Sequence, residues 1–504
     1  MRKLDDPLLQ ERLNYAYLEI GDVTKMKIVN KLLDPKFEDS DKFIEHLIQF
    51  MRNPKNFWFT CKYLLNIDLL PYQLTILQKM WVKPFPMLIA SRGAAKCITK
   101  DSICITNKGL LDITEIIGPT PRSMERIYLN DNAYGENGFN KIEYGWYNGK
   151  TKNTKITTNF GFSLEGTGDH PVRILKDGKI EWSHLEDIKI GDYTIILRDK
   201  IDLPNNHPEI TEDIAWWLGA TTGDGQVSDP HSINFTNTDP DIINKWISVG
   251  KKILNKEHCG KTGITYRFST VQGSKLVNEH FELNYKKSHD KAIPRKIRES
   301  GSKNIAAFLR GLFDTDGCVT NRGAVEYCSV SEKMIDQVHS ALLTFGIISK
   351  KRSFYSSCNG KKFLAYKITI TNINNIKLYD KYIGFDCGYK NIKLKNVLNK
   401  KSNPNKDIIP KQLITDKLLS LVKQARDRGF IASNTHSYSY VRGLLSSYRI
   451  NKYEISYDTL NKILNILSEH SDIKEYQQCK DIYNKNYYYH RNLVGICIEV
   501  TRGQ

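Results

Sequence analysis

An internal repeat constrains the fold of this chain more than any other feature. The segments Trp216–Val227 (WWLGATTGDGQV) and Phe308–Val319 (FLRGLFDTDGCV) are each an apolar run that ends in aspartate and glycine, with a probable strand after it. They lie roughly 90 residues apart, and two copies are too few for a repeat array but enough for a pseudo-dimer. The region around them, residues 205–400, mixes helix and strand patterns, so it is expected to be an α+β domain with pseudo-two-fold symmetry.

The residues before the repeat have a different period. From Cys97 to residue 204 apolar and polar residues alternate, which predicts an all-β domain. Asn107–Gly109 and Asp177–Gly178 are turn signals between strands, and residues 188–197 (IKIGDYTIIL) read as another strand pair. A final strand is predicted near the end of the chain, within residues 487–500.

Helical spacing of apolar residues returns at both ends of the chain. It predicts a mainly helical segment over residues 1–96, which ends in a buried strand at Met87–Ala90, and a helical extension over residues 401–485. A polar linker, Asn399–Asp407, marks the boundary before that extension. The expected segments are therefore 1–96, 97–204, 205–400, 401–485 and 486–504.

Charge and composition limit the class of protein. The net charge is +18, which favours a polyanionic partner such as nucleic acid; a Lys- and Asn-rich genome is the alternative explanation. No apolar run approaches the ~18 residues that span a membrane, so no membrane partner is expected. The ten cysteines form no CxxC pair, which argues against a zinc site or a disulfide framework. A reducing compartment, the cytoplasm, is expected.

The strand at Met87–Ala90 runs into a pattern typical of a phosphate-binding loop, Ala90–Lys96. The loop stops at Lys96, because Cys97 stands where a Ser or Thr should ligate Mg²⁺; a surface turn is the alternative reading. Together with Pro71-Tyr72-Gln73, a glutamine motif, this segment resembles the start of the ATPase domain of phage terminase large subunits, which package DNA. The resemblance implies that Gln73, Arg92 and Lys96 bind ATP with Mg²⁺ once the motor is complete.

The residues that follow Lys96 resemble a second family. The stretch from Cys97 (CITKDSICITNKGLLDITEI) resembles the opening block of an intein, and Gly166–Ile174 (GTGDHPVRI) resembles its Thr-x-x-His block. Cys97 would attack the carbonyl of Lys96 to form a thioester, which needs a polarised carbonyl and a protonated leaving nitrogen. His170 would give that proton and Thr167 would orient the peptide. The alternative is a small buried cysteine and a loop histidine in a structural role. The resemblance implies a Hint splicing fold.

The repeat itself resembles the paired LAGLIDADG motifs of DOD-type homing endonucleases. Small residues there let two helices approach closely, and their last acids, Asp224 and Asp316, would lie side by side and hold a divalent metal, Mg²⁺. The segment DKAIPRKI resembles the lysine block of the family, which points to Lys291, and Lys390 in GFDCGYK is the candidate of the second half. The partner implied is double-stranded DNA. The alternative is that both acids only cap turns.

These resemblances combine into one hypothesis. An intein with an endonuclease is inserted between Lys96 and the missing hydroxyl residue of a terminase, so the ATPase is expected to be inactive. The blocks that end a splicing intein are not recognisable, because Asn492 is followed by Leu493, which offers no nucleophile. The chain is therefore expected not to splice in cis. A separate C-terminal intein–extein chain as partner, a truncated or frameshifted gene and an incomplete sequence are the three explanations.

Three functions remain open from the sequence. The first is metal-dependent, site-specific cleavage of double-stranded DNA, with the uninterrupted phosphate-loop gene as target. The second is an inactive terminase ATPase fragment. The third is a DNA-binding module whose nuclease has decayed.

Overall fold

The computed structural model of the 504-residue chain describes residues 98–118, 127–145, 153–284, 287–358, 360–399, 408–429, 454–485 and 487–498, with residues 439, 441–443 and 445. The chain divides into two compact units, Met1–Ala94 and Ala95–Gln504. Every described residue belongs to the second unit, so the predictions for residues 1–96 and for Cys97 lie outside the described part. No helix among the described residues is long and apolar enough to cross a membrane.

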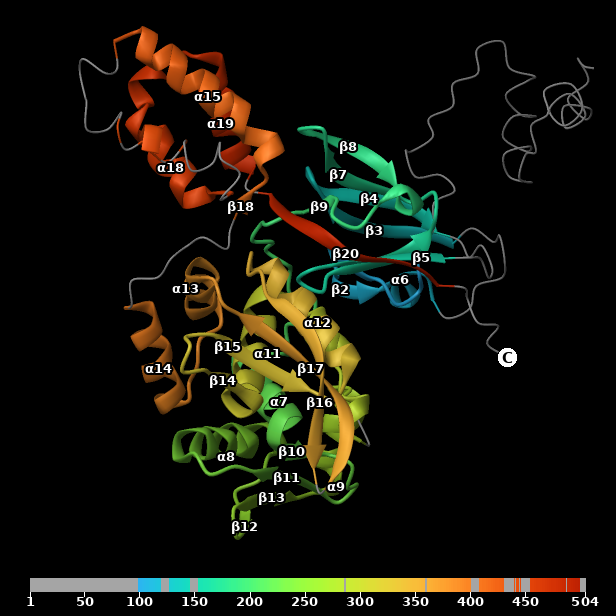
Figure 1. Cartoon of the computed structure of the whole chain (residues 1–504). Coiled ribbons are helices and arrows are strands. Elements are labelled where there is room, and N and C mark those ends of the chain that lie inside the picture. Colours follow the sequence, from blue (N-terminus) through green and yellow to red (C-terminus); the bar gives the residue numbers. More distant parts are fainter. Residues whose placement is uncertain are drawn as a thin grey trace, which may run out of the picture. The chain divides into compact units, whose positions relative to one another are not determined.

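The repeat takes the form of two copies of one order of elements, each a long helix, a hairpin, a second helix and a second hairpin (Figure 1). The first copy contains α7 (Glu212–Asp224), β10 (Gly225–Gln226), β11 (Ser232–Thr236), α8 (Pro240–Leu254), β12 (Gly260–Thr262), β13 (Thr265–Ser269) and α9 (Val271–Lys275). After α10 (Arg295–Arg298), the second contains α11 (Gly301–Asp316), β14 (Gly317–Val319), β15 (Val325–Ser329), α12 (Glu332–Thr344), β16 (Lys350–Cys358), β17 (Lys361–Ile370), α13 (Ile373–Tyr382) and α14 (Gly388–Leu398). Their sheets have equivalent orders, β10-β11-β13-β12 and β14-β15-β17-β16, so the predicted pseudo-two-fold arrangement is confirmed.

Small residues bring the two long helices into contact. A Cβ on Gly219 of α7 would come 2.1 Å from the carbonyl oxygen of Phe308, and a Cβ on Gly311 of α11 would come 2.1 Å from that of Trp216. No side chain fits at such distances, so backbone meets backbone at both positions. The prediction of closely packed repeat helices is confirmed.

An aromatic cluster supports the far side of α7. The ring of Trp246 on α8 stacks on Trp217 at 5.5 Å and on Phe235 at 4.7 Å between ring centroids. Both indole nitrogens have acceptors: Trp217 Nε1 donates to the Trp246 carbonyl oxygen, and Trp246 Nε1 donates to Thr221 Oγ1. A buried tryptophan needs such a partner for its N–H, so the cluster fixes α7 without leaving a polar group unsatisfied.

Residues 98–200 are mostly strands, and the described part contains two sheets there. One has the order β2-β1-β3-β4, from β1 (Ile103–Thr106), β2 (Gly109–Asp112), β3 (Ile127–Gly135) and β4 (Gly138–Gly145). The other has the order β6-β5-β20-β9-β7-β8. Its strands are β5 (Asn153–Thr158), β6 (Ser163–Thr167), β7 (Pro171–Lys176), β8 (Lys179–His184), β9 (Tyr193–Ile196) and β20 (Tyr488–Ile498).

The hairpin predictions in this region are mostly correct. Asn107–Lys108 connects β1 to β2, and Asp177–Gly178, with φ of 48° and 72°, connects β7 to β8. Residues 188–197 are not a strand pair, because only Tyr193–Ile196 is a strand. The preceding residues form a turn in which Lys189 N donates to Asp192 Oδ2. The region is also not purely β: it contains the short helix α6 (Ile113–Ile117) and a 3-10 turn at Leu185–Asp187.

β20 comes from the other end of the chain and lies between β5 and β9 (Figure 1). It pairs antiparallel with both: Gly495 faces Ile156 of β5, and Tyr489 faces Ile195 of β9. The strand predicted near the end of the sequence is therefore present, and it completes a sheet that begins more than three hundred residues earlier.

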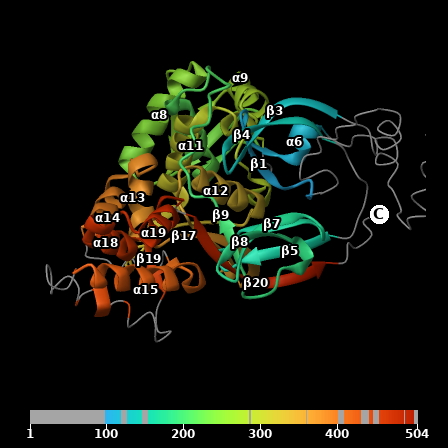
Figure 2. The same cartoon turned by 90° about the horizontal axis from the view of Figure 1, so that it is seen from above.

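The predicted helical extension contains α15 (Lys411–Asp427), α18 (Tyr457–Ile466) and α19 (Lys474–Lys485), with a small sheet of β18 (Ile408–Ile409) and β19 (Ile455–Ser456). These helices lie together in Figure 2 and share a buried core that includes Leu418, Leu460 and Cys479. Leu175 and Tyr193 of the β-rich region belong to the same core, so the extension packs on β7 and β9.

Candidate active site

The two long helices end at the predicted acids. Asp224 is the last residue of α7 and Asp316 the last of α11, and a glycine that starts a strand follows each. A Cβ on Gly225 would come 2.3 Å from the carbonyl oxygen of Thr221, and one on Gly317 would come 2.6 Å from that of Phe313. The chain leaves each helix so close to the last turn that only glycine fits. The Asp–Gly pair of each motif therefore places its acid at a helix end.

The two acids lie near each other. A Cβ on Gly223, the residue before Asp224, would be 3.4 Å from Asp316 Oδ2. Burial among protein atoms raises the pKa of Asp316 to about 6; the charge of Lys291 acts to lower that pKa, and the charge of Asp224 acts to raise it. The side chain of Asp316 still reaches solvent. The juxtaposition predicted from the repeat is therefore present in the structure.

The pKa of Asp224 is also raised, mainly because burial disfavours its charged form. Asn237 Nδ2 donates to Asp224 Oδ2 at 2.6 Å, which acts in the opposite direction. The nearby donors and positive charges do not fully offset the effect of burial on these two acids, so an added cation between them would be favourable. Among the described residues, however, no three His, Cys, Asp or Glu side chains come together as a metal-binding group.

Each predicted lysine donates to the carbonyl of the residue that precedes one of these acids. Lys291 Nζ donates to Gly223 O at 2.9 Å, and Lys390 Nζ donates to Thr315 O at 3.0 Å. Lys390 also donates to the carbonyls of Phe313 and Asp314 at 3.1 and 2.6 Å. Positive charge at the C-terminus of a helix is favourable.

Burial lowers the pKa of Lys291 and of Lys390, while the nearby acids act to raise both. Each acid thus has one lysine at its helix end, and the arrangement of the first half is repeated in the second. Carboxylates with adjacent ammonium groups can hold a divalent cation and stabilise negative charge that develops on a phosphate.

Two functional neighbours had no signal in the sequence. Asn237 lies in a turn before α8, and no period marks it. Asp314, two residues before Asp316, is buried and accepts hydrogen bonds from Trp216 Nε1 at 2.8 Å and from the amides of Asp386 and Cys387 at 2.9 and 3.0 Å. Mainly because of burial, the pKa of Asp314 rises to about 6. It links α7, α11 and the segment that leads to Lys390.

A second group of predicted residues lies at the start of the β-rich region. Ile98, the residue after Cys97, forms an antiparallel bridge with Gly166, and Thr99 N donates to Glu165 O at 3.0 Å. The chain that leaves Cys97 therefore runs beside the end of β6, where Thr167 lies. His170 N donates to Thr167 O at 2.9 Å, so the turn holds both predicted residues close together in the chain. Cys97, Lys96, Arg92 and Gln73 lie outside the described residues, and the ATP site stays a prediction.

Residues 303–384 match the family described as LAGLIDADG-like domain. The match covers α11 from its third residue, Lys303, to its acid Asp316, and both strands of the β16–β17 hairpin, but ends before Lys390. The second half of the repeat is thus a LAGLIDADG-like domain, as the motif predicted.

Two relatives illustrate how the similarity is distributed. The replication factor C small subunit of Methanocaldococcus jannaschii is 30% identical over 346 residues, which is 65% of this chain and 18% of that protein. The replicative DNA helicase DnaB of Synechocystis is 25% identical over 282 residues, 51% of this chain and 31% of that protein. The chain spans less than a third of the length of either. Neither is named as a terminase, and the resemblance of residues 1–96 to terminases stays a prediction.

A solved structure, described as mesophilic variants from the homing endonuclease I-DmoI, aligns with 34% of this chain and 95% of its own. The identity is 15% and the TM-score 0.24. At that score the likeness decides nothing about the fold.

Proposed function

We propose that the repeat region cleaves double-stranded DNA at a specific site with the help of a divalent metal. The observation that carries this proposal is the pair Asp224 and Asp316, each at a helix end and each with its own lysine, Lys291 or Lys390. Two equivalent half-sites match the two strands of a duplex. The LAGLIDADG-like match over residues 303–384 and the net charge of +18 support the same reading.

The donor set suits Mg²⁺, because it offers carboxylate oxygens. Burial disfavours the negative charge of these carboxylates, so an added cation would be favourable. Asp224 and Asp316 would hold the metal, and oxygens of DNA phosphates and water would complete its ligands. Such a metal, when bound, favours a nucleophilic hydroxide and offsets charge on the phosphate. Asn237 donates to the Asp224 carboxylate and so orients it. The two lysines would add positive charge beside the negative charge that develops on the phosphate.

The test is cleavage of a DNA fragment that carries the uninterrupted phosphate-loop sequence, in the presence of Mg²⁺. Asp224→Asn and Asp316→Asn are expected to abolish cleavage while the full chain still binds the fragment. Asp213→Asn, at the other end of α7, is the matched control and should cleave normally. Binding of the fragment by the wild-type chain without cleavage would instead support the alternative function, a decayed nuclease that only binds DNA.

A second function is favoured by the bridge between Ile98 and Gly166. We infer that Cys97 Sγ gives up its proton and attacks the carbonyl carbon of Lys96, so that an S–C bond forms while the C–N bond between Lys96 and Cys97 breaks. His170 would supply the proton to the leaving nitrogen, and Thr167 would orient the peptide. The result is a thioester, as in the first step of protein splicing.

The relatives support an element that can lie inside different proteins. A contiguous stretch of 65% of the chain must include both motifs, Trp216–Val227 and Phe308–Val319, and the match makes up only 18% of the replication factor C subunit. The helicase DnaB, a protein with a different name, matches about half of this chain. We propose a terminase as the host of this copy, on the motif at Gln73 and Lys96 alone.

Thiol-induced release of residues 1–96 by dithiothreitol tests the splicing chemistry. Cys97→Ala should abolish the release, and His170→Ala should slow it. Cys104→Ala on β1 is the matched control, because Cys104 is a neighbouring cysteine whose thiol pKa burial raises to about 11. Release that persists in Cys97→Ala would refute the assignment.

A further inference from the structure

Lys291 is held in place through its backbone. Ser331 Oγ, at the start of α12, donates to the Lys291 carbonyl at 2.6 Å. Two residues later Ile293 N donates to Gln337 Oε1 at 2.7 Å, and the Ile293 carbonyl accepts from Arg298 Nε at 3.1 Å. These contacts fix the chain on which Lys291 reaches the end of α7.

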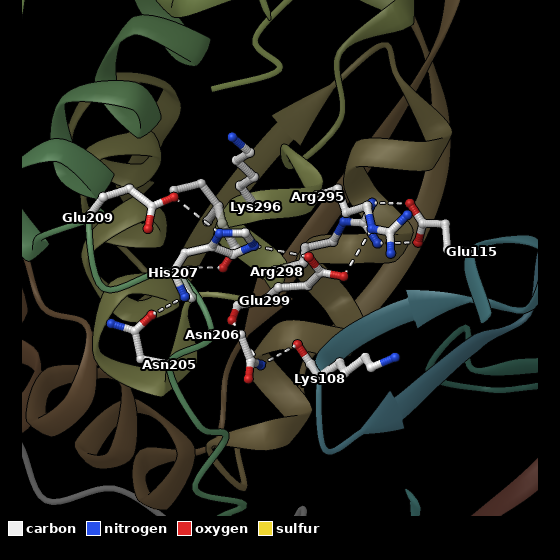
Figure 3. Close-up of polar contacts among 12 residues, drawn as sticks. Lys108, Glu115, Asn205, Asn206, His207, Glu209, Arg295, Lys296, Arg298 and Glu299 are labelled. Carbon is white, nitrogen blue, oxygen red and sulfur yellow. Dashed lines mark hydrogen bonds and ion pairs between the residues drawn. The ribbon is translucent and has the colours of Figure 1, made fainter. Parts of the chain in front are cut away.

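The same guanidinium of Arg298 reaches into the β-rich region (Figure 3). Its Nη1 donates to the Leu110 carbonyl at 2.7 Å, and its two terminal nitrogens bind the Glu115 carboxylate at 2.7 and 2.6 Å. Arg298 is only 4% exposed. A bidentate arginine–carboxylate pair of this kind is both strong and geometrically specific. Arg298 therefore joins the repeat region to the β-rich region with one side chain.

Glu115 in turn lies in α6, the short helix that follows the β1–β2 hairpin. Its Oε2 accepts from the amide of Asp112, the last residue of β2, at 2.8 Å. Burial acts to raise the pKa of Glu115, but the hydrogen bonds and charge of Arg298 outweigh it and lower that pKa. The Glu115 carboxylate is thus charged, and it ties the hairpin to Arg298.

The turn of the β1–β2 hairpin packs against α10, the helix that carries Arg298. A Cβ on Gly109, whose φ is +132°, would come 2.1 Å from the Arg298 carbonyl oxygen. Beside it Asn206 Nδ2 donates to the Lys108 carbonyl at 3.0 Å (Figure 3). Further charged groups surround the contact: His207 lies between Glu209 and Glu299, and Arg295 pairs with Glu299, the residue that follows α10.

The hairpin leads directly to the proposed splicing centre. Four residues, Thr99–Ser102, separate β1 from Ile98, and Ile113 N donates to the Ser102 carbonyl at 3.1 Å. A displaced hairpin would therefore move the chain that bridges Ile98 to Gly166. Its position matters because a misplacement of about 1 Å in a reacting group can cost about a hundredfold in rate.

We propose that Arg298 is a positioning residue shared by the two proposed reactions. One part of its guanidinium fixes the loop that carries Lys291, and the other fixes the hairpin that anchors the chain after Cys97. The inference rests on the proposed functions, and it predicts that the endonuclease and the splicing chemistry depend on one side chain that touches neither substrate.

The test compares Arg298→Lys, Glu115→Ala and Arg295→Ala in the full chain. Lysine keeps the charge but cannot make the bidentate pair together with the carbonyl contacts. In Arg298→Lys, the kcat of DNA cleavage and the rate of thiol-induced release are each expected to fall about tenfold to a hundredfold, with an unchanged KM for DNA. In Glu115→Ala only the release should slow, because Arg298 still holds Ile293. Arg295→Ala, the control on the same short helix, should stay within about twofold of wild type.

Hydrogen exchange of the amides of residues 103–112 gives a reading that requires neither activity. Exchange there should be faster in Arg298→Lys and Glu115→Ala than in Arg295→Ala. Outside residues 103–112, the three variants should unfold at the same melting temperature. Unchanged exchange in Arg298→Lys would overturn the inference. Rates in Arg298→Lys equal to those of Arg295→Ala would overturn it as well. A wild-type chain that performs neither reaction would instead count against the proposed functions, while the exchange measurement still decides the role of Arg298.

Discussion

Gly219 on α7 and Gly311 on α11 are equivalent residues of the repeat, and a Cβ on either would come 2.1 Å from a carbonyl oxygen of the opposite helix. Each glycine precedes the aspartate at the end of its own helix, Asp224 or Asp316, by the same number of residues. The contact that brings the helices together therefore also sets the spacing of the two acids.

The first prediction concerns this contact. Gly219→Ala and Gly311→Ala should each lower the free energy of unfolding by about 1–3 kcal/mol, because the new methyl group must push the helices apart. Urea unfolding followed by circular dichroism measures the change. Gly443→Ala, a helical position with open space around it, is the control. Equal stability of Gly311→Ala and Gly443→Ala would contradict the close approach.

The second prediction concerns a trade between stability and activity at Asp316. Since its pKa is raised to about 6, the ionised carboxylate at pH 7.5 is unfavourable in the folded chain. Asp316→Asn should raise the free energy of unfolding by roughly 1 kcal/mol, after allowance for solvent screening. The same change should lower the cleavage rate by about a hundredfold or more. Thermal unfolding and a cleavage assay at pH 7.5 check the two effects; loss of both stability and cleavage would argue for a structural carboxylate.

The third prediction separates the two lysines. Lys390 is buried and donates to three carbonyls at the end of α11, whereas Lys291, which donates to the Gly223 carbonyl, is only half-buried. Lys390→Met should therefore destabilise the chain by about 3 kcal/mol, and Lys291→Met by less. Both should impair DNA cleavage. Urea unfolding at one pH measures the difference, and a larger loss for Lys291→Met would contradict the assigned contacts.

The fourth prediction concerns pH. His339 on α12 is fully buried against the ring of Phe162, at 3.9 Å between centroids, and burial lowers its pKa to about 4. Its Nε2 faces the Ser349 carbonyl at 3.0 Å and donates to it. The unfolded chain binds a proton at this residue near pH 6.5, and the folded chain only near pH 4. The stabilisation is therefore complete above pH 6.5 and is lost as the pH falls from there to 4.

This effect amounts to up to about 3 kcal/mol. It should show as a difference between wild type and His339→Phe in the pH dependence of unfolding, because other acids titrate in the same range. At pH 7 the two should differ little in slope, and between pH 6.5 and 4 the wild type should lose stability faster. Parallel curves for the two proteins would contradict a lowered pKa of His339 in the folded chain.

The elements that sequence predicted best are those in which one residue type decides the local geometry. The Asp–Gly ends of α7 and α11 were visible because only glycine fits where the chain turns back on the last helical turn. The lysine partners were found through a resemblance, and their carbonyl contacts were not. The match over residues 303–384 includes Asp316 but ends before Lys390, so it supports the second motif and not its lysine.

The remaining features depend on contacts between distant residues. Nothing near Arg298 indicates that the Leu110 carbonyl and Glu115 lie beside it. Likewise, Asp314 resembles any polar residue in an amphipathic helix until Trp216 is seen to donate to it. The prediction of a strand pair at residues 188–197 is wrong because the Gly191–Asp192 dipeptide forms a turn there, with Gly191 at φ of 99° and Lys189 N donating to Asp192 Oδ2, so that only Tyr193–Ile196 is a strand.

The place of β20 has a consequence for synthesis on the ribosome. β5 and β9 emerge early, yet the strand that separates them is made only after both copies of the repeat and the helical extension. Until then the nascent chain presents two open sheet edges, a hazard for aggregation. The intervening repeat region can meanwhile acquire its own core from local contacts. Translation speed and chaperone access, rather than the equilibrium free energy, are thus expected to govern the yield of the assembled protein.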